Sequence, residues 1–309
     1  QKDRTASDPL LHTMLGTTQL GWLKSRIDDA KTAGARWLFL ISTISFEDVR
    51  LKPGSVDAVF TDPPYFNNVQ YAELIDFCYA WLHLLLGADV ADFRVESTRN
   101  MGELTGNKTL GRGLTHFTQG LSRVFTAASR ALKPGAPFVF TYHHNEVSAY
   151  VPIVVSILDA GLDCTATLPA PAEMSASLHI NGTGSSVMDS VIICRKTKTP
   201  DAEQRVGESS LRSWLKRDMA RLLEGGIKCS KGDLMCLGTG HLARVATRRL
   251  RPGWDTHADI ESRIARARVE LESLLRRCSL ARVVEGFCAE SSGAARTPAH
   301  ELAQARIFD

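Results

Sequence analysis

Residues 54–65 read GSVDAVFTDPPY, and this stretch decides the fold class. The apolar run 56–61 follows a turn at 52–55 and predicts a buried strand. The strand ends at the Asp-Pro-Pro-Tyr loop, 62–65, where the prolines fix φ and hold the preceding residue in an extended conformation. A carboxylate on a rigid loop is therefore expected at the carboxyl end of a strand, where open α/β sheets bind ligands.

Short apolar strands alternate with helical segments through most of the chain up to residue 195. This alternation predicts an α/β fold with a mostly parallel sheet. The last two strands have no helix between them, which favours a hairpin at the sheet edge. The expected strands are 37–41, 56–61, 138–142, 162–168 and 188–195, and the expected helices are 20–33, 71–86, 117–132 and 147–160.

The chain is expected to divide into three regions. An α/β region, 1–196, is followed by a polar linker, 197–210, and by a mainly helical region, 211–309. Within the first region the polar, glycine-containing stretch 89–113 predicts a mobile loop or lid. The helices expected in the last region are 211–223, 234–250 and 259–278.

The composition is typical of a folded globular protein, with 309 residues, 44% hydrophobic and 23% charged, and a formal net charge of +3. This mild positive charge neither requires nor opposes a nucleic-acid partner. Seven cysteines without a C-x-x-C pair indicate reduced thiols, and no apolar run reaches the roughly 18 residues that span a bilayer. With no signal peptide, we expect a cytoplasmic protein. We expect no metal site, because adjacent His143 and His144 point to opposite sides of a strand.

The Asp-Pro-Pro-Tyr loop suits methylation of an exocyclic amino group. Such a nitrogen is a poor nucleophile because its lone pair is delocalised into the base. Asp62 offers a carboxylate acceptor and Pro63 a carbonyl acceptor for its two N–H groups, while Tyr65 offers a ring for stacking, worth about 1–3 kcal/mol per base. A base in a duplex must first be flipped out. The alternative is a proline-rich turn with a packed tyrosine, and the strand before the loop favours the functional interpretation.

The sequence resembles the large adenine-specific DNA methylases with a DUF1156-like N-terminal region. The matching text is GSVDAVFTDPPY at 54–65, NNVQYAEL at 67–74, DFCYAWL at 76–82 and RALKPG at 130–135. The resemblance implies a Rossmann-like methyltransferase sheet in the catalytic region 1–196. It also implies S-adenosyl-L-methionine as cofactor, DNA as partner and the N6 amino group of adenine as target. The catalytic residues that it implies are Asp62, Pro63, Pro64 and Tyr65.

Further candidate residues lie around this loop and in the helical region. Helix capping, packing or a solvated loop are the alternatives for several of them, and the arginines share one helical face that could meet DNA phosphates. The candidates for cofactor binding are Ser45, Asn67 and Asn68, and those for nucleic-acid binding are Tyr71, His143, Asn145, Arg244, Arg248 and Arg251.

The family's glycine-rich cofactor loop, D-P-F-x-G-x-G, does not precede the Asp-Pro-Pro-Tyr loop. Residues 1–61 are too few for that loop and the opening strands of the sheet, and the chain begins with Gln1 rather than methionine. We therefore expect an N-terminal region or a separate subunit to carry the loop. Residues 233–240 contain a G-x-G but run into a basic helical segment, so we interpret them as helix.

Two other functions remain open from the sequence. Related Asp-Pro-Pro-Tyr loops would also suit methylation of cytosine N4 in DNA or guanine N2 in RNA. The other alternative is a truncated, non-catalytic domain that binds nucleic acid or a partner subunit.

Overall fold

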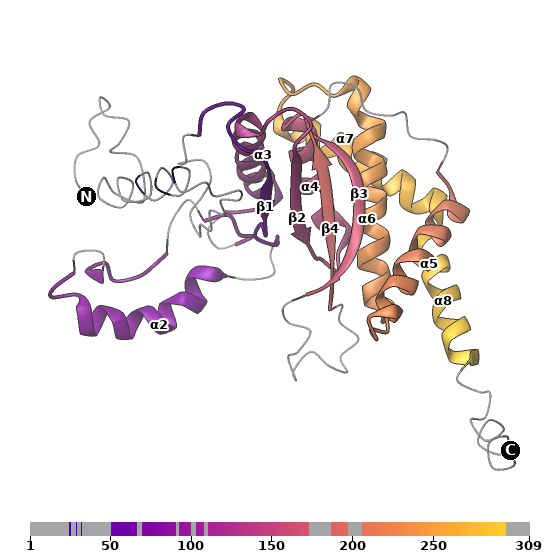
Figure 1. Ribbon diagram of the computed structural model, residues 1–309, viewed down its shortest axis with the longest axis horizontal. Helices are drawn as coiled ribbons and strands as arrows, with labels where there is room; N and C mark the ends of the chain where they lie inside the picture. The colour runs from indigo at the N-terminus through magenta and orange to yellow at the C-terminus, as the bar shows by residue number, and fades with distance from the viewer. Residues whose placement is uncertain are drawn as a thin grey trace, which may run out of the picture.

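The structure is a computed structural model that describes residues 51–66, 70–90, 93–99, 103–107, 111–172, 187–196 and 206–294, together with Ser25, Asp29 and Thr32. The expected strand 37–41, and all of the expected helix 20–33 except those three residues, lie outside the described residues. The described strands form one four-stranded sheet in the order β1-β2-β4-β3 (Figure 1). Their bounds are β1 Val59–Thr61, β2 Pro137–Tyr142, β3 Asp163–Pro171 and β4 Met188–Arg195.

The sheet is mixed rather than mostly parallel. Strand β1 pairs with β2 in parallel, whereas β2 with β4 and β3 with β4 pair antiparallel, so two of the three described pairings depart from the expectation. The reason is that β3 and β4, the last two described strands along the chain, pair with each other in antiparallel orientation, and β4 then lies between β3 and β2. The edge hairpin predicted for the last two strands is confirmed, and so is the α/β, Rossmann-like class.

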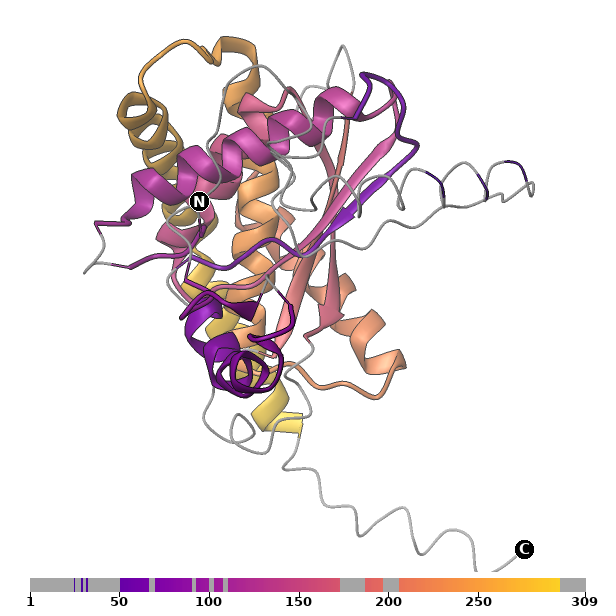
Figure 2. The same ribbon diagram turned by 90° about the vertical axis from the view of Figure 1, so that its left-hand side faces the viewer.

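Helices α3 (Leu114–Ala131), α4 (Val151–Asp159) and α6 (Lys231–Leu250) pack on one face of the sheet. Figure 2 shows this layer beside the strands. Phe138 and Phe140 alternate along β2 toward this layer, and both rings contact Phe125 of α3, with centroids 4.9 and 5.0 Å apart. The alternation follows from the two-residue period of a strand, which sends every second side chain to the same face.

The opposite face of the sheet is left open by the described residues. Phe60 of β1 is 68% exposed there, and Val139, Val191 and Ile193 are only half-buried. These side chains alternate with the buried ones of β1, β2 and β4, so the sheet has one core face and one apolar face that no described helix covers.

The helical region shares its core with the sheet. Helix α6 begins with a capping box, in which Ser230 and Asp233 bond each other's backbone amides, and it packs along β3, β4 and α4. One continuous cluster of buried side chains joins the sheet to this region. Its further helices are α5 Glu208–Glu224, η7 Arg251–Gly253, α7 Ile260–Cys278 and α8 Leu280–Ala294, of which α8 was not predicted.

Helix α2, Tyr71–Leu86, has the bounds that the sequence predicts and projects away from the sheet layer (Figure 1). Its large apolar side chains stay exposed, with Phe77 76%, Trp81 63% and Leu84 75% exposed. None of the described helices is at once long and apolar enough to cross a membrane.

Several described residues of the stretch predicted as a mobile loop or lid are hydrogen bonded to α2. Ser97 and Thr98 donate to the carboxylate of Asp76, at 2.7 and 2.6–2.7 Å. Glu103 accepts the backbone N–H of Ala72 at 3.0 Å, in the first turn of the helix. These described parts therefore brace α2 instead of standing free of it.

Candidate functional site

The sheet register brings the Asp-Pro-Pro-Tyr loop beside the end of β2. Thr61 pairs with Phe140, so Asp62 and Thr141 are the next residues on two parallel strands. The hydroxyls of Thr141 and Tyr65 both donate to Oδ1 of Asp62, the second at 3.2 Å. In the part of the chain that the structure describes, no hydrogen bond reaches Oδ2, and Asp62 is exposed. One oxygen of this exposed carboxylate is thus held in place, and the other has no hydrogen bond within the described part of the chain.

The rest of the loop is anchored more deeply. Pro63 is buried, and Pro64 and Tyr65 are half-buried. The Tyr65 ring meets Tyr142 edge-on, with centroids 5.4 Å apart at 77°, and lies 6.3 Å from the ring of His143. Tyr65 therefore packs against the core without being enclosed by it, which leaves part of its ring accessible beside the Asp62 carboxylate.

The environment of Tyr65 keeps its hydroxyl protonated. Burial raises the pKa of Tyr65 well above its usual value, and the negative charges of Asp189 and Asp62 raise it further. A phenol in this setting donates a hydrogen bond to Asp62 and does not act as a base.

His144 and Phe66 fix the far end of the loop. His144 is buried; its Nε2 donates to the carbonyl of Phe66 at 2.8 Å, and its Nδ1 accepts the N–H of Glu146 at 2.9 Å. This pair of bonds requires the neutral ring with the proton on Nε2, and burial lowers the pKa of His144 accordingly. The Phe66 ring packs against Phe117 of α3, with centroids 5.3 Å apart.

His143 differs from its neighbour in charge. Its Nδ1 donates to the Met188 carbonyl at 2.9 Å and lies 3.8 Å from the Asp189 carboxylate. Burial alone would lower the pKa of His143, but its contacts with Cys236, Met188 and Asp189 together raise it to about 9. The site therefore carries a cationic imidazole beside Tyr65 at neutral pH, while the candidate Asn145 lies exposed in the loop that follows.

Several sequence candidates are not placed. Ser45, Asn67 and Asn68 lie outside the described residues. Tyr71 begins helix α2, and its side chain is not among those described. No group of three or more described His, Cys, Asp or Glu side chains is arranged to hold a metal ion.

The G-x-G of residues 233–240 lies inside helix α6, as the sequence predicts. A Cβ on Gly240 would stand 2.5 Å from Oγ of Ser190, and one on Gly238 would stand 2.4 Å from Cδ1 of Leu280. These glycines let the helix approach β4 and α8 closely. In the described part of the chain, this G-x-G therefore serves the packing of a helix and does not form a loop.

The three candidate arginines each contact other residues of the protein. Arg248 forms an ion pair with Asp163 at 3.2 Å, and Arg251 donates to the carbonyl of Leu158 at 2.9 Å. Arg244 lies over the ring of Trp214, 4.7 Å from its centroid. Because the guanidinium groups of Arg248 and Arg251 bond other residues of the protein, we do not propose these two residues as DNA contacts.

Sequence reasoning missed three residues that shape the site. They are Thr141, His144 and Asp189. Thr141 carried a usable signal, since it lies at the end of a predicted strand expected to run parallel to the strand before Asp62. Asp189 carried none, because its approach to His143 depends on the antiparallel insertion of β4 beside β2.

Known proteins resemble this chain in structure rather than in sequence. No protein-family model and no curated protein sequence matches it. Two similar crystal structures are both of TTHA0409 from Thermus thermophilus, named as a "Putative DNA Modification Methylase". The selenomethionine derivative is 16% identical with a TM-score of 0.26 over 53% of each chain, so this chain spans about half of its length. The other is 15% identical with a TM-score of 0.27, over 66% of this chain and 83% of that one. Similarity at this level does not indicate a function.

Proposed function

We propose that this chain carries the base-binding and catalytic part of an S-adenosylmethionine-dependent DNA methyltransferase acting on the N6 amino group of adenine. One observation supports this above all others: the Asp62 carboxylate is held through Oδ1 and presents Oδ2 at the open carboxyl end of β1. An acceptor so oriented matches the N–H donor of an exocyclic amino group.

The Pro63 carbonyl would be the second acceptor. No backbone amide in the described part of the chain donates to it. Two acceptors on the two N–H groups draw the amino nitrogen away from conjugation with the ring and free its lone pair. S-adenosylmethionine, when bound, would supply the methyl group on a sulfonium that is already electrophilic. The chain's own residues then contribute by positioning, which can account for a large part of a rate enhancement.

The target base would be flipped from the duplex and rest against Tyr65. The Tyr65 hydroxyl bonds Asp62, so the stacking ring and the carboxylate form one unit. His143 would contribute a positive charge toward DNA, and the other proposed DNA contacts are Asn145, two residues after His143, and Tyr71, six residues after Tyr65. Ser45, Asn67 and Asn68 remain the proposed cofactor contacts, together with a glycine-rich loop on an N-terminal region or partner subunit. Such an enzyme would work in the cytoplasm.

The experiment measures transfer of a labelled methyl group from S-adenosylmethionine to defined duplex oligonucleotides by the intact protein. Asp62→Ala is expected to reduce transfer by a factor of about 100 or more, as loss of a transition-state contact to a charged group does. The unfolding transition should stay in place, because Asp62 is exposed. Asp57→Asn is the matched control, since it removes an exposed carboxylate from the same segment, where it pairs with Lys133. Methyl transfer that is unchanged in the Asp62→Ala variant would contradict the proposal.

The same assay separates the alternatives that the sequence leaves open. A duplex whose only adenines are replaced by unsubstituted purine has no exocyclic amino group at those positions, and labelling that persists on it would point to cytosine N4 as the target. Labelling of RNA alone would identify guanine N2. Absence of labelling on every substrate, with no heat of S-adenosylmethionine binding in calorimetry, would favour the non-catalytic domain.

A further inference from the structure

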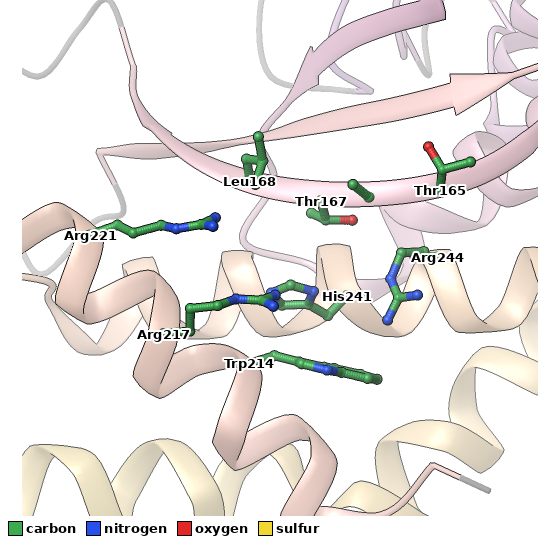
Figure 3. A pocket seen from close by; sticks show the side chains of 9 residues that line it. Thr165, Thr167, Leu168, Trp214, Arg217, Arg221, His241 and Arg244 are labelled. Carbon is green, nitrogen blue, oxygen red and sulfur yellow. The ribbon is translucent and has the colours of Figure 1, made fainter. Parts of the chain in front are cut away.

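A pocket of about 360 Å³ lies at the sheet edge formed by β3, between that strand and helices α5 and α6. In the sheet order β1-β2-β4-β3 this is the edge opposite the Asp62 loop, so the pocket is separate from the proposed methyl-transfer site. Figure 3 shows its lining side chains, which come from three elements. They are Thr165, Ala166, Thr167, Leu168, Trp214, Arg217, Arg221, His241 and Arg244.

The pocket is strongly cationic. Arg217 and Arg221 lie four residues apart on α5 and reach toward the strand, and Arg244 enters from α6 (Figure 3). Arg217 and Arg221 are exposed, and within the described part of the chain neither has a carboxylate at ion-pair distance. Among the described residues, no acidic side chain lines the pocket. The two guanidinium groups of Arg217 and Arg221, side by side at one space without a carboxylate partner in the described part of the chain, favour an anionic ligand.

Two buried polar atoms in the lining have no hydrogen-bond partner within the described part. They are Oγ1 of Thr167, a residue 3% exposed, and Nδ1 of His241, a residue 1% exposed. The other ring nitrogen of His241, Nε2, donates to the Asp218 carboxylate at 2.6 Å. Leaving a buried polar group unpaired costs about 1–3 kcal/mol, so atoms of this kind mark a place where a ligand group completes the bonding.

We propose that this pocket binds the terminal phosphate of a small phosphorylated molecule. The phosphate oxygens accept hydrogen bonds from Arg217, Arg221 and the Thr167 hydroxyl. Nδ1 of His241 lies among the lining groups beside these donors, and Nε2 of the same ring bonds Asp218.

The geometry favours a small molecule over a nucleic-acid backbone. Thr167 and His241 are almost fully buried, so a group that reaches them must be narrow and lead the ligand into the pocket. A terminal phosphate monoester has this shape, whereas a phosphodiester is flanked by sugars on both sides. The volume of about 360 Å³ also falls in the range of small-molecule sites.

The test is calorimetric titration of the full chain with inorganic phosphate, pyrophosphate and adenosine monophosphate. Two single-stranded oligonucleotides that differ only in a 5′-phosphate or 5′-hydroxyl end form the nucleic-acid arm. Saturable binding of at least one small phosphate is expected. The oligonucleotide with a 5′-phosphate should bind with higher affinity than the one with a 5′-hydroxyl. If none of the three small phosphates binds, the proposal is overturned, even where the two oligonucleotides bind equally well. No methyl donor is present, so the outcome is independent of the proposed methyl transfer.

Two variants locate the binding. The double change Arg217→Gln and Arg221→Gln alters exposed side chains and should weaken binding about tenfold or more. The matched control, Arg268→Gln with Arg277→Gln, removes the same charge from exposed positions on α7 and should leave binding unchanged.

Thr167→Val distinguishes a ligand contact from a structural role. Because its hydroxyl has no partner within the described part, valine should keep or raise the thermal midpoint while weakening phosphate binding several-fold. The assignment is contradicted if the α7 control weakens phosphate binding as much as the double arginine change in the pocket does. It is also contradicted if neither that double change nor Thr167→Val weakens binding.

Discussion

The hydroxyl of Thr141 donates a hydrogen bond to Oδ1 of Asp62, across the parallel pairing of β1 with β2. The two residues are 79 positions apart in sequence and meet because Thr61 pairs with Phe140. The orientation of the Asp62 carboxylate is therefore set by the sheet as well as by the prolines of its own loop. A change in strand register would misdirect the carboxylate even with the Asp-Pro-Pro-Tyr sequence intact.

Thr141→Val is accordingly expected to reduce methyl transfer without unfolding the protein. Hydrogen bonds to charged groups contribute about 1.5–3 kcal/mol, which corresponds to a rate loss of roughly 10- to 150-fold if the orientation of Asp62 is needed only in the transition state. Initial rates on an adenine-containing duplex measure the effect, with the thermal transition as the check on folding.

Thr115→Val is the control for this change. Its hydroxyl also donates to a carboxylate, that of Glu261, at 2.7 Å, but on the exposed side of α3. A Thr141→Val protein as fast as the unaltered one, or a Thr115→Val protein equally slow, would show that the threonine does not orient Asp62.

The pKa values of the two adjacent histidines should be shifted in opposite directions. The pKa of His143 is raised from 6.5 to about 9, while burial lowers the pKa of His144 below 6.5. Two-dimensional NMR of the ring protons, assigned with His143→Gln and His144→Gln variants, measures both midpoints. Midpoints that coincide near 6.5 would contradict the contacts described for both rings.

The stability consequences of these shifts have opposite signs. For His143, the folded protein binds the proton more tightly, so its contribution is fully present below pH 6.5 and is lost as the pH rises through about 9. For His144, the folded protein favours the neutral ring, so its contribution is present above pH 6.5 and is lost as the pH falls below it. The difference in the free energy of unfolding between the unaltered protein and each Gln variant, measured in urea across this pH range, should show the two opposite slopes.

The sequence predicted the elements with local signals and missed those set by long-range pairing. The run 56–61 and its loop have apolar, turn and proline signals in one short stretch, and the helix 71–86 ends at a glycine. The place of β4 between β2 and β3 has no such signal, because antiparallel insertion depends on distant partners. Helix α8 was missed because it follows α7 directly, broken only by Ser279 at φ 47°.

The candidate site shows the same contrast between residues with a local sequence signal and residues whose contacts depend on distant parts of the chain. The loop 62–65 was found because its residue types indicate their chemistry within four positions. The candidate arginines share a helical face, but helical spacing alone does not reveal what that face meets. In the fold it meets Asp163 and the carbonyl of Leu158, which engage Arg248 and Arg251.

Asp159 should contribute strongly to stability. Its carboxylate accepts from Ser122 of α3, from the indole of Trp254 at 2.9 Å and from Arg263 of α7, so it joins three segments at the end of α4. Asp159→Ala leaves Arg263, only 16% exposed, without its partner and should lower the free energy of unfolding by about 3–5 kcal/mol.

Urea denaturation measures this loss, and Glu272→Ala is the comparison. Glu272 forms an exposed pair with Arg276 at 3.8 Å on the same helix α7, which should contribute no more than about 0.5 kcal/mol. Equal effects of the two substitutions would show that Asp159 is not specially placed.

The two glycines of α6 should differ in their tolerance of alanine. At Gly240 a Cβ would meet Oγ of Ser190 at 2.5 Å and its Cβ at 3.0 Å, and Ser190 is fixed in the buried strand β4. The helix would have to move away from the sheet, so Gly240→Ala should destabilise the protein by about 1–3 kcal/mol.

At Gly238 the near atom is the tip of the Leu280 side chain, with the next atoms at 3.6 Å or beyond, so a rotamer change can relieve the contact. Alanine also gains about 1 kcal/mol of helix propensity over glycine, which offsets that adjustment. Gly238→Ala should therefore be near neutral in urea denaturation. If the glycines served instead as a flexible loop, both substitutions would be tolerated alike, and the difference between them is what close packing of α6 on β4 requires.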